Sequence, residues 1–226
     1  MEETANVLFH IGPLEVTGTV TTMWVIILLL TLVSWLATRN LKDVPGPLQN
    51  VAEMAVSSLQ NYFEGTLGKE YAKKYFPMFA TFFVFIIVCN YSGLLPGAGH
   101  LKGFSVPTAC LSVTAALALI SFFMTHVIGI KEKGFWKYLV SVLKSMTWPL
   151  FFLAIIEQFI RPLSLALRLH GNLYGEESVT EYLYNLFPIG LPLVMNILSL
   201  LFCFIQALVF TMLISIYTSE ALEAEE

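Results

Sequence analysis

A polar stripe runs along one face of an apolar helix that we expect between residues 148 and 174. Arg168 stands here among leucines and alanines, and a charge at mid-bilayer costs about 2.5–3.5 kcal/mol on insertion scales. With about 100° between successive helical residues, Arg161 and Glu157 lie within about 20° of Arg168. Ser164 and Asn172 lie within about 40° of it. The spacing predicts a narrow, positively charged seam roughly 22 Å long.

The chemistry open to Arg168 is that of a fixed charge. An arginine pKa above about 12 means that the side chain attracts or repels ions but does not carry a proton. A carboxylate opposite it is held ionised, and a cation cannot pass it directly through a medium of low dielectric. The alternative to a functional role is that Arg168 forms a structural salt bridge. The nearest acid on the stripe, however, is Glu157, which is spaced to pair with Arg161. We therefore interpret Arg168 as a gate for ions.

The last apolar stretch of the sequence carries a weaker polar face. Gln206 and Ser199 are seven residues apart and share one side of a helix. Three acids, Glu176, Glu177 and Glu181, lie in the expected connection between the last two stretches, where they would concentrate cations at the outer mouth. The alternatives are a hydrogen bond between helices for Gln206 and a solvated loop for the acids.

The elements that must position these residues are membrane-spanning helices. The chain has 226 residues, of which 57% are hydrophobic and 12% charged. These are too few charged residues to cover the surface of a water-soluble globular protein. About 20 apolar residues cross the hydrocarbon as a helix. We predict an all-α membrane protein that forms a single integral membrane domain with about five spans. They cover about residues 20–37, 76–95, 106–130, 148–174 and 192–218.

The last two spans are expected to be unusual in length and shape. Each would form roughly 40 Å of helix, too long to stand upright in about 30 Å of hydrocarbon. We therefore expect a tilted hairpin, with Pro162 kinking the first of its helices but not ending it. Residues 48–64 carry apolar side chains at helical spacing, which predicts one amphipathic helix on the membrane surface, with a soluble linker helix as the alternative.

Basic residues set the expected orientation. Most of them occur in the connections after the first and third spans, which should be cytoplasmic because positively charged loops stay inside. Five spans then put the N-terminus outside and the C-terminus in the cytoplasm, which we expect in a bacterial plasma membrane. The residues of these two connections are Arg39, Lys42, Lys69, Lys73, Lys74, Lys131, Lys133, Lys137 and Lys144.

Several classes of function are excluded by composition and motifs. A net charge of −4 argues against a nucleic-acid partner. Residues 65–69 (GTLGK) lack the spacing of a phosphate-binding loop, so we expect no bound nucleotide. Cys89, Cys110 and Cys203 are far apart in apolar runs, without metal or redox spacing. We expect no metal ion and no cofactor.

Residues 161–172 (RPLSLALRLHGN), followed by Glu177, by residues 206–210 (QALVF) and by Tyr217, resemble subunit a of the F-type ATP synthase. Residues 90–96 (NYSGLLP) also fit that family. The resemblance covers nearly the whole chain. It departs at Ser199, where some relatives have histidine, so which group relays ions beside Gln206 is left open.

The resemblance implies a non-catalytic stator subunit beside a rotating ring of c subunits and next to the peripheral-stalk b subunits. Two half-channels would lead ions to the ring from opposite sides, and Arg168 matches the family's essential arginine. Asn172, Glu177, Ser199 and Gln206 would line the outer half-channel, and Glu157 and Ser164 the inner one. The coupling ion, a proton or sodium, is set largely by the ring.

Two other classes of function are alternatives to the one that the resemblance implies. A stand-alone ion channel or secondary transporter would use an intramembrane arginine to bind an anion. An intramembrane serine protease would need a dyad, for which Ser92 with His100 or His126 is the available material, without the usual motif around the serine. We expect His126 and His170 to be packed aromatic side chains, because neither belongs to the arginine stripe.

Overall fold

The computed structural model describes residues 7–11, 14–39, 46–94, 105–144, 148–186 and 190–223. Two short strands, β1 (Val7–Ile11) and β2 (Leu14–Thr17), pair antiparallel before the first helix. The helices are α1 (Gly18–Thr38), α2 (Pro47–Leu67), α3 (Lys69–Ser92), α4 (Leu111–Lys133), α5 (Phe135–Lys144), α6 (Trp148–Leu186) and α7 (Leu191–Glu223), with a 3₁₀ turn at Pro107–Ala109. The expectation of an all-α membrane protein holds apart from the strand pair, which sequence analysis did not predict.

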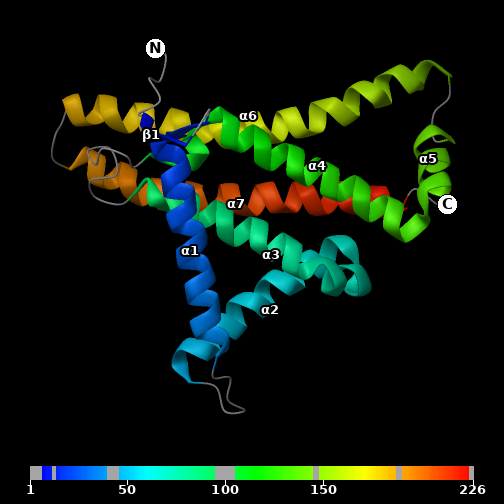
Figure 1. Cartoon of the computed structure of the whole chain (residues 1–226), viewed down its shortest axis with the longest axis horizontal. Coiled ribbons are helices and arrows are strands. Elements are labelled where there is room, and N and C mark those ends of the chain that lie inside the picture. The colour runs from blue at the N-terminus through cyan, green and yellow to red at the C-terminus, as the bar shows by residue number, and fades with distance from the viewer. Residues whose placement is uncertain are drawn as a thin grey trace.

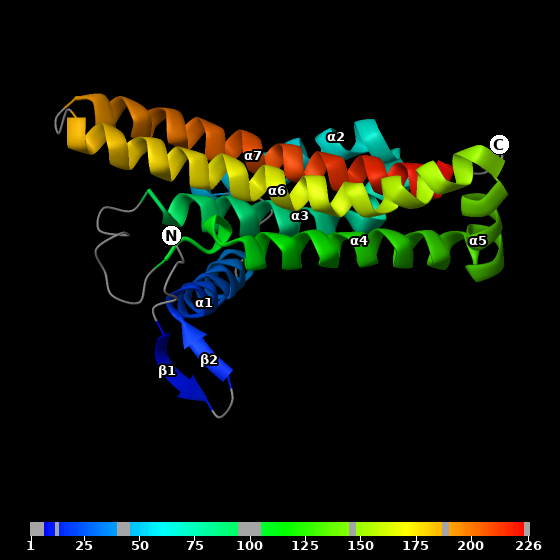
Figure 2. The ribbon, with the colours of Figure 1, turned by 90° about the horizontal axis from the view of Figure 1, so that it is seen from above.

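Four helices form the body of the molecule. Helices α3, α4, α6 and α7 lie side by side (Figures 1 and 2). Helices α6 and α7 run antiparallel along the length of this body. Their shared core includes Phe79, Phe210, Ile86 and Leu169, each with 0% of its surface exposed. In a bilayer the lipid tails are as apolar as these side chains, so close van der Waals packing and hydrogen bonds between the helices stabilise the core. The core therefore holds α6 and α7 against α3 and α4.

Four helices are long and apolar enough to cross a membrane. They are Gly18–Thr38, Lys69–Ser92, Leu111–Lys133 and Val194–Leu222. Among the described residues, α6 does not meet this criterion, and its sequence carries six acidic or basic residues. The structure thus supports an integral membrane protein with four apolar helices, while the fifth span and the tilt of the last two helices stay predictions.

Helix α6 is longer than the predicted fourth span. We expected the span to end at about residue 174, but the helix continues through Gly171 and Gly175 to Leu186. It also continues through Pro162, as expected. A glycine inside a helix costs only about 1 kcal/mol relative to alanine, which contacts with α7 offset. The acids after Gly175 therefore belong to α6 and not to a loop.

The amphipathic helix predicted at 48–64 corresponds to α2. Val51 and Met54 are exposed, whereas Phe63 is fully buried near the other end of the helix. Phe63 contacts Phe79 of α3, with 5.2 Å between the ring centroids. One end of α2 is therefore anchored in the core, and the other presents apolar side chains to its surroundings.

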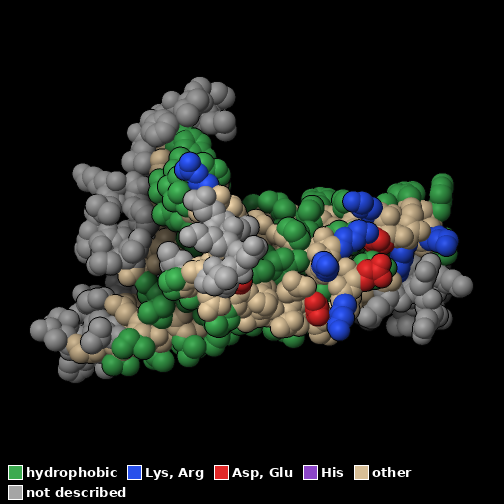
Figure 3. Space-filling view, turned by 90° about the horizontal axis from the view of Figure 1, so that it is seen from below, with side chains coloured by type: hydrophobic (Ala, Val, Ile, Leu, Met, Phe, Trp, Pro, Cys, Tyr) green, Lys and Arg blue, Asp and Glu red, His purple; other side chains and the backbone are tan. Residues whose placement is uncertain are grey.

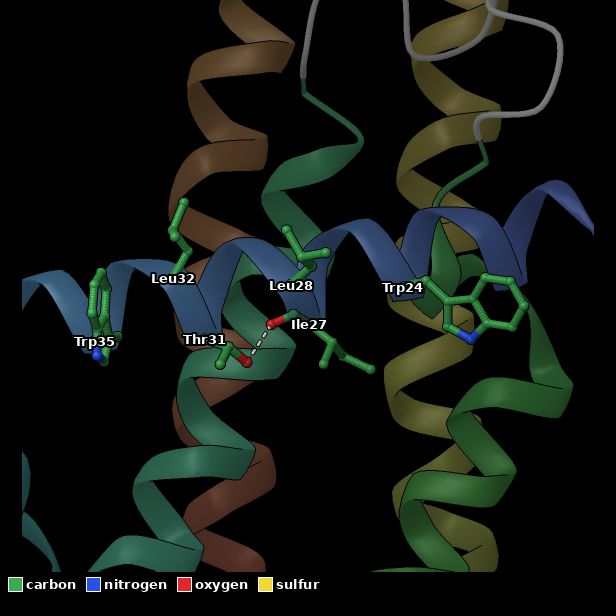
Figure 4. A pocket seen from close by; sticks show the side chains of 6 residues that line it. All are labelled: Trp24, Ile27, Leu28, Thr31, Leu32 and Trp35. Atoms are coloured by element: carbon green, nitrogen blue, oxygen red, sulfur yellow. Dashed lines mark hydrogen bonds between the residues drawn. The ribbon is translucent and has the colours of Figure 1, made fainter.

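Helix α1 crosses the body of the molecule and keeps most of its apolar surface outward (Figure 1). Figure 4 shows six of its side chains around a shallow hollow, with Trp24 and Trp35 at its two ends. Leu28 between them is 69% exposed. The Thr31 hydroxyl donates a hydrogen bond to the carbonyl of Ile27 at 2.8 Å and is thus satisfied within the helix. A surface of this composition suits contact with lipid tails.

Charged side chains gather toward one end of the molecule (Figure 3). Lys74 of α3 and Glu132 of α4 form an ion pair of 2.6 Å, and the hydroxyl of Tyr75 donates to the same carboxylate. This pair joins two segments that the charge distribution assigns to the same side of the membrane. The arrangement agrees with the predicted pairing of those connections, while the direction in which the chain faces stays a prediction.

Candidate functional site

Arg168 lies on the outside of the chain. Its α6 neighbours Leu165, Leu169 and Leu173 are buried in the core with at most 7% exposure, and Arg168 belongs to the exposed residues. Among the side chains that the structure describes, none forms an ion pair with Arg168. The structural salt bridge considered from the sequence is therefore not seen in this part of the chain. The guanidinium is presented outward, where a group from another molecule can meet it.

Arg161, two turns earlier, is in the opposite electrostatic situation. It forms an ion pair with Glu157 at 2.7 Å, which confirms the pair predicted from their spacing, and a second with Glu220 of α7 at 2.5 Å. Its guanidinium also lies over the ring of Tyr217, 4.9 Å from the centroid. The stripe thus contains one neutralised arginine, which ties α6 to α7, and one arginine that has no ion-pair partner among the described side chains.

Asn172 and Gln206 join the polar faces of α6 and α7. The Asn172 Nδ2 group donates to Oε1 of Gln206 at 2.7 Å. This is the interhelical hydrogen bond that sequence analysis kept as the alternative for Gln206. It leaves Nε2 of Gln206 buried without a hydrogen-bond partner among the described residues, so this group remains available to donate to a water.

Ser199 is buried between the helices, and its partner was not predicted. Only 2% of its surface is exposed, and the carboxylate of Glu176 on α6 lies close to its hydroxyl. Glu176 follows Arg168 and Asn172 at intervals of four residues, a spacing that keeps side chains close on one side of a helix. Sequence analysis placed Glu176 in a loop, so this signal was overlooked.

Helix α3 contributes two polar contacts to the same region of α7. Asn90 donates through Nδ2 to the carbonyl of Cys203 at 3.2 Å, and the Tyr91 hydroxyl donates to the carbonyl of Leu200 at 3.3 Å. Asn90 is only 1% exposed, and its Oδ1 has no partner among the described residues. The face of α7 between Ser199 and Gln206 is therefore bordered by polar groups from α6 and α3.

The structure says less about the other three residues that were predicted to line the ion paths. Ser164 is half-buried on α6, and Glu157 is held by Arg161 and is 56% exposed at its side chain. The backbone of Glu177 belongs to α6, but its side chain lies outside the described part of the structure. The sequence assignments of these three residues to ion paths stay predictions.

His126 and His170 have aromatic neighbours, as expected. His126 lies 4.2 Å from the ring of Phe122, and His170 stacks on Tyr174 at 5.6 Å between centroids. The Ser92 hydroxyl donates to the carbonyl of Cys89 at 2.6 Å. It is thus engaged within its own helix, which gives no support to a dyad with His126. His100 lies outside the described residues.

The sequence is similar to a family of known membrane proteins. The family described as ATP synthase A chain matches residues 20–219. ATP synthase subunit a of Geotalea uraniireducens is 44% identical over 203 residues, which cover 88% of this chain and 85% of that protein. The ATP synthase subunits a of Trichlorobacter lovleyi and Moorella thermoacetica are 41% and 38% identical over 96% and 93% of this chain, and over 91% and 93% of their own lengths.

Proposed function

Since this chain belongs to the family of ATP synthase subunit a, the membrane subunit of the F-type ATP synthase that serves ATP synthesis and ion transport, we propose that it is the ion-translocating stator subunit of that rotary complex. The observation that carries this proposal is the contrast between the two arginines of α6. Arg161 is neutralised inside the chain, whereas Arg168 is exposed and unpaired among the described residues. The free guanidinium would meet the carboxylates of a c-subunit ring.

In this proposal Arg168 works by electrostatics alone. A ring carboxylate that arrives opposite the guanidinium is stabilised in its ionised form and releases its cation toward the exit path. The same charge repels a free cation, because two positive charges repel each other strongly in a medium of low dielectric. Ions then cross only by riding the ring, and each elementary charge moved through 100 mV contributes about 2.3 kcal/mol.

We assign the ion paths to the two ends of α6 and α7. Asn172, Glu177, Ser199 and Gln206 would line the outer half-channel, which the contact between Asn172 and Gln206 and the burial of Ser199 support. Glu157 and Ser164 would line the inner one, near the end of the molecule where the charged side chains gather (Figure 3).

The remaining parts of the proposal concern the setting of the chain. The N-terminus would lie outside the bacterial plasma membrane and the C-terminus in the cytoplasm, because the basic segments gather at one end. The exposed apolar surface of α1 (Figure 4) suits lipid, and the peripheral-stalk b subunits would hold the chain against rotation.

A comparison of the chain alone with the whole complex tests the proposed function. We expect ATP-driven ion uptake in vesicles that contain the complete synthase and no uptake or passive ion flux in vesicles that contain this chain alone. Carrying out the uptake at fixed pH with and without sodium identifies the coupling ion. Specific ion transport by the purified chain would favour the stand-alone channel and contradict a stator role.

A variant of Glu177 tests the outer half-channel. Replacing Glu177 with glutamine removes a negative charge at the expected outer mouth, so we predict a severalfold slower ATP-driven uptake with normal assembly, because cations are no longer concentrated there. Initial uptake rates per assembled complex measure the effect. Rates equal to those of the unmodified protein would remove Glu177 from the ion path.

A further inference from the structure

Helix α5 lies across the end of α4 (Figures 1 and 2). Gly134, with φ +82°, separates the two helices, and the ring of Tyr138 on α5 packs back against Gly129 of α4. A Cβ atom added to Gly129 would lie 2.5 Å from Cε2 of that ring. His126, one turn earlier on α4, lies 6.1 Å from it between ring centroids. The chain therefore folds back after α4, with Tyr138 facing the last turns of that helix.

The end of α4 sets the depth of α5 in a membrane. Helix α4 has 23 residues, which make roughly 35 Å of helix and exceed the about 30 Å of hydrocarbon that a span must cross. Its last turn carries Lys131 and Lys133 and so reaches the lipid headgroups. Gly129 is four residues before this end, so the ring of Tyr138 reaches back roughly 6 Å along α4. This contact keeps α5 at the boundary between headgroups and acyl chains.

The side of α5 opposite Tyr138 is apolar and exposed. At about 100° per residue, Trp136 and Val140 each lie about 160° from Tyr138. Their exposed fractions are 75% and 52%, and among the described elements α5 packs mainly on α4. Tryptophan is enriched at the interface between membrane and water, and a short helix with one apolar side and basic residues is typical of that position.

The segment around α5 is also strongly basic. Residues 131–144 contain four lysines and a single acid, Glu132. Glu132 is paired with Lys74 of α3 at 2.6 Å, so its carboxylate is engaged by a different helix. Lys131 and Lys137 are exposed, and neither forms an ion pair among the described side chains. Their charges are therefore available to a negatively charged ligand.

We propose that α5 and the end of α4 form a binding site for anionic phospholipids. Trp136 and Val140 contact the upper part of the acyl chains, and Lys131 and Lys137 attract the negatively charged headgroup. Zwitterionic lipid offers the same chains but no net charge, so the lysines select the anionic lipid. A lysine near an anionic membrane surface contributes roughly a fivefold gain in affinity. The inference concerns the lipid around the chain and does not depend on the ion paths proposed above.

Photo-crosslinking from α5 in the intact synthase tests the proposal. Trp136→benzoylphenylalanine puts a photoreactive side chain on the exposed face, in complexes reconstituted into nanodiscs of phosphatidylcholine and phosphatidylglycerol. We expect lipid adducts in which phosphatidylglycerol is enriched at least about fivefold over its share of the mixture. Lys131→Gln and Lys137→Gln should each lower this enrichment, and the variant with both changes should approach the ratio of the bulk lipids. High salt should act in the same direction, because it screens exposed charges.

A lysine outside this segment provides the matched control. Lys69 is exposed at the start of α3, so Lys69→Gln removes the same charge and should leave the enrichment at position 136 unchanged. The content of assembled complex separates folding from lipid binding, and Val140→benzoylphenylalanine probes the same face if the first probe impairs assembly.

Two outcomes would overturn the inference. Lipid adducts in the bulk ratio that do not respond to Lys131→Gln and Lys137→Gln would show apolar contact without selection of charge. Adducts with another protein subunit in place of lipid would make α5 a protein-binding surface. Both outcomes leave the stator role untouched, because that role is tested by ion transport and not by lipid contact.

Discussion

Replacing Arg168 with alanine is expected to abolish both ATP-driven ion pumping and gradient-driven ATP synthesis in membrane vesicles. The guanidinium has no ion-pair partner among the described side chains, so its removal breaks no contact that holds this part of the chain together. In the proposed mechanism, the variant would lose the fixed charge that holds an arriving carboxylate ionised and blocks the straight route for cations. Pumping should fall to the level of vesicles without the complex, measured by ATP-driven uptake.

A neighbouring exposed position provides the control. Leu167 precedes Arg168 on the same helix and is 51% exposed, so Leu167→Ala removes comparable surface without removing charge. We expect pumping per assembled complex in this variant to stay close to that of the unmodified protein. Coupled pumping that survives in Arg168→Ala would refute the gate.

Reversing the charge of Arg161 is expected to destabilise the contact between α6 and α7 and to lower the yield of assembled complex strongly. Arg161→Glu would place a third acid beside Glu157 and Glu220 and would lose the ring contact with Tyr217. The two acids are 56% and 48% exposed, so solvent screens part of the effect. We estimate a loss of about 2 kcal/mol, measured as a lower unfolding temperature of the purified complex.

A compensating substitution makes this second result specific. In Arg161→Glu with Glu220→Arg, the new arginine on α7 faces two acids on α6, so the same three charges are present in exchanged positions. We expect this double variant to recover most of the lost unfolding temperature. If it remained as unstable as Arg161→Glu alone, the ion pairs would not be what joins the helices at this end.

Periodicity along one helix was enough to predict contacts within that helix. The pair of Arg161 with Glu157 follows from a spacing of four residues, whereas the exposure of Arg168 had to come from the structure. Hydropathy also located the apolar helices, because their length is set by the thickness of the bilayer.

Contacts between helices could not be predicted in the same way. Helical spacing gives the direction of each side chain but not the offset between two helices, so the partners of Gln206 and Ser199 had to come from the structure. The end of α6 was misjudged because two glycines suggested a connection, whereas packing against α7 continues the helix. For this reason Glu176 was placed in a connection and not on α6 beside Ser199.

The outward position of Arg168 also bears on how the complex is put together. If α6 spans the membrane as proposed, a copy of the chain that inserts alone would expose the charge of Arg168 to lipid, at a cost of about 2.5–3.5 kcal/mol. A rotor that offers a carboxylate removes this penalty, and since about 1.4 kcal/mol corresponds to a factor of ten, it would favour association by roughly a hundredfold. In the proposed mechanism, Arg168 would then stabilise the correctly assembled complex in addition to directing ions.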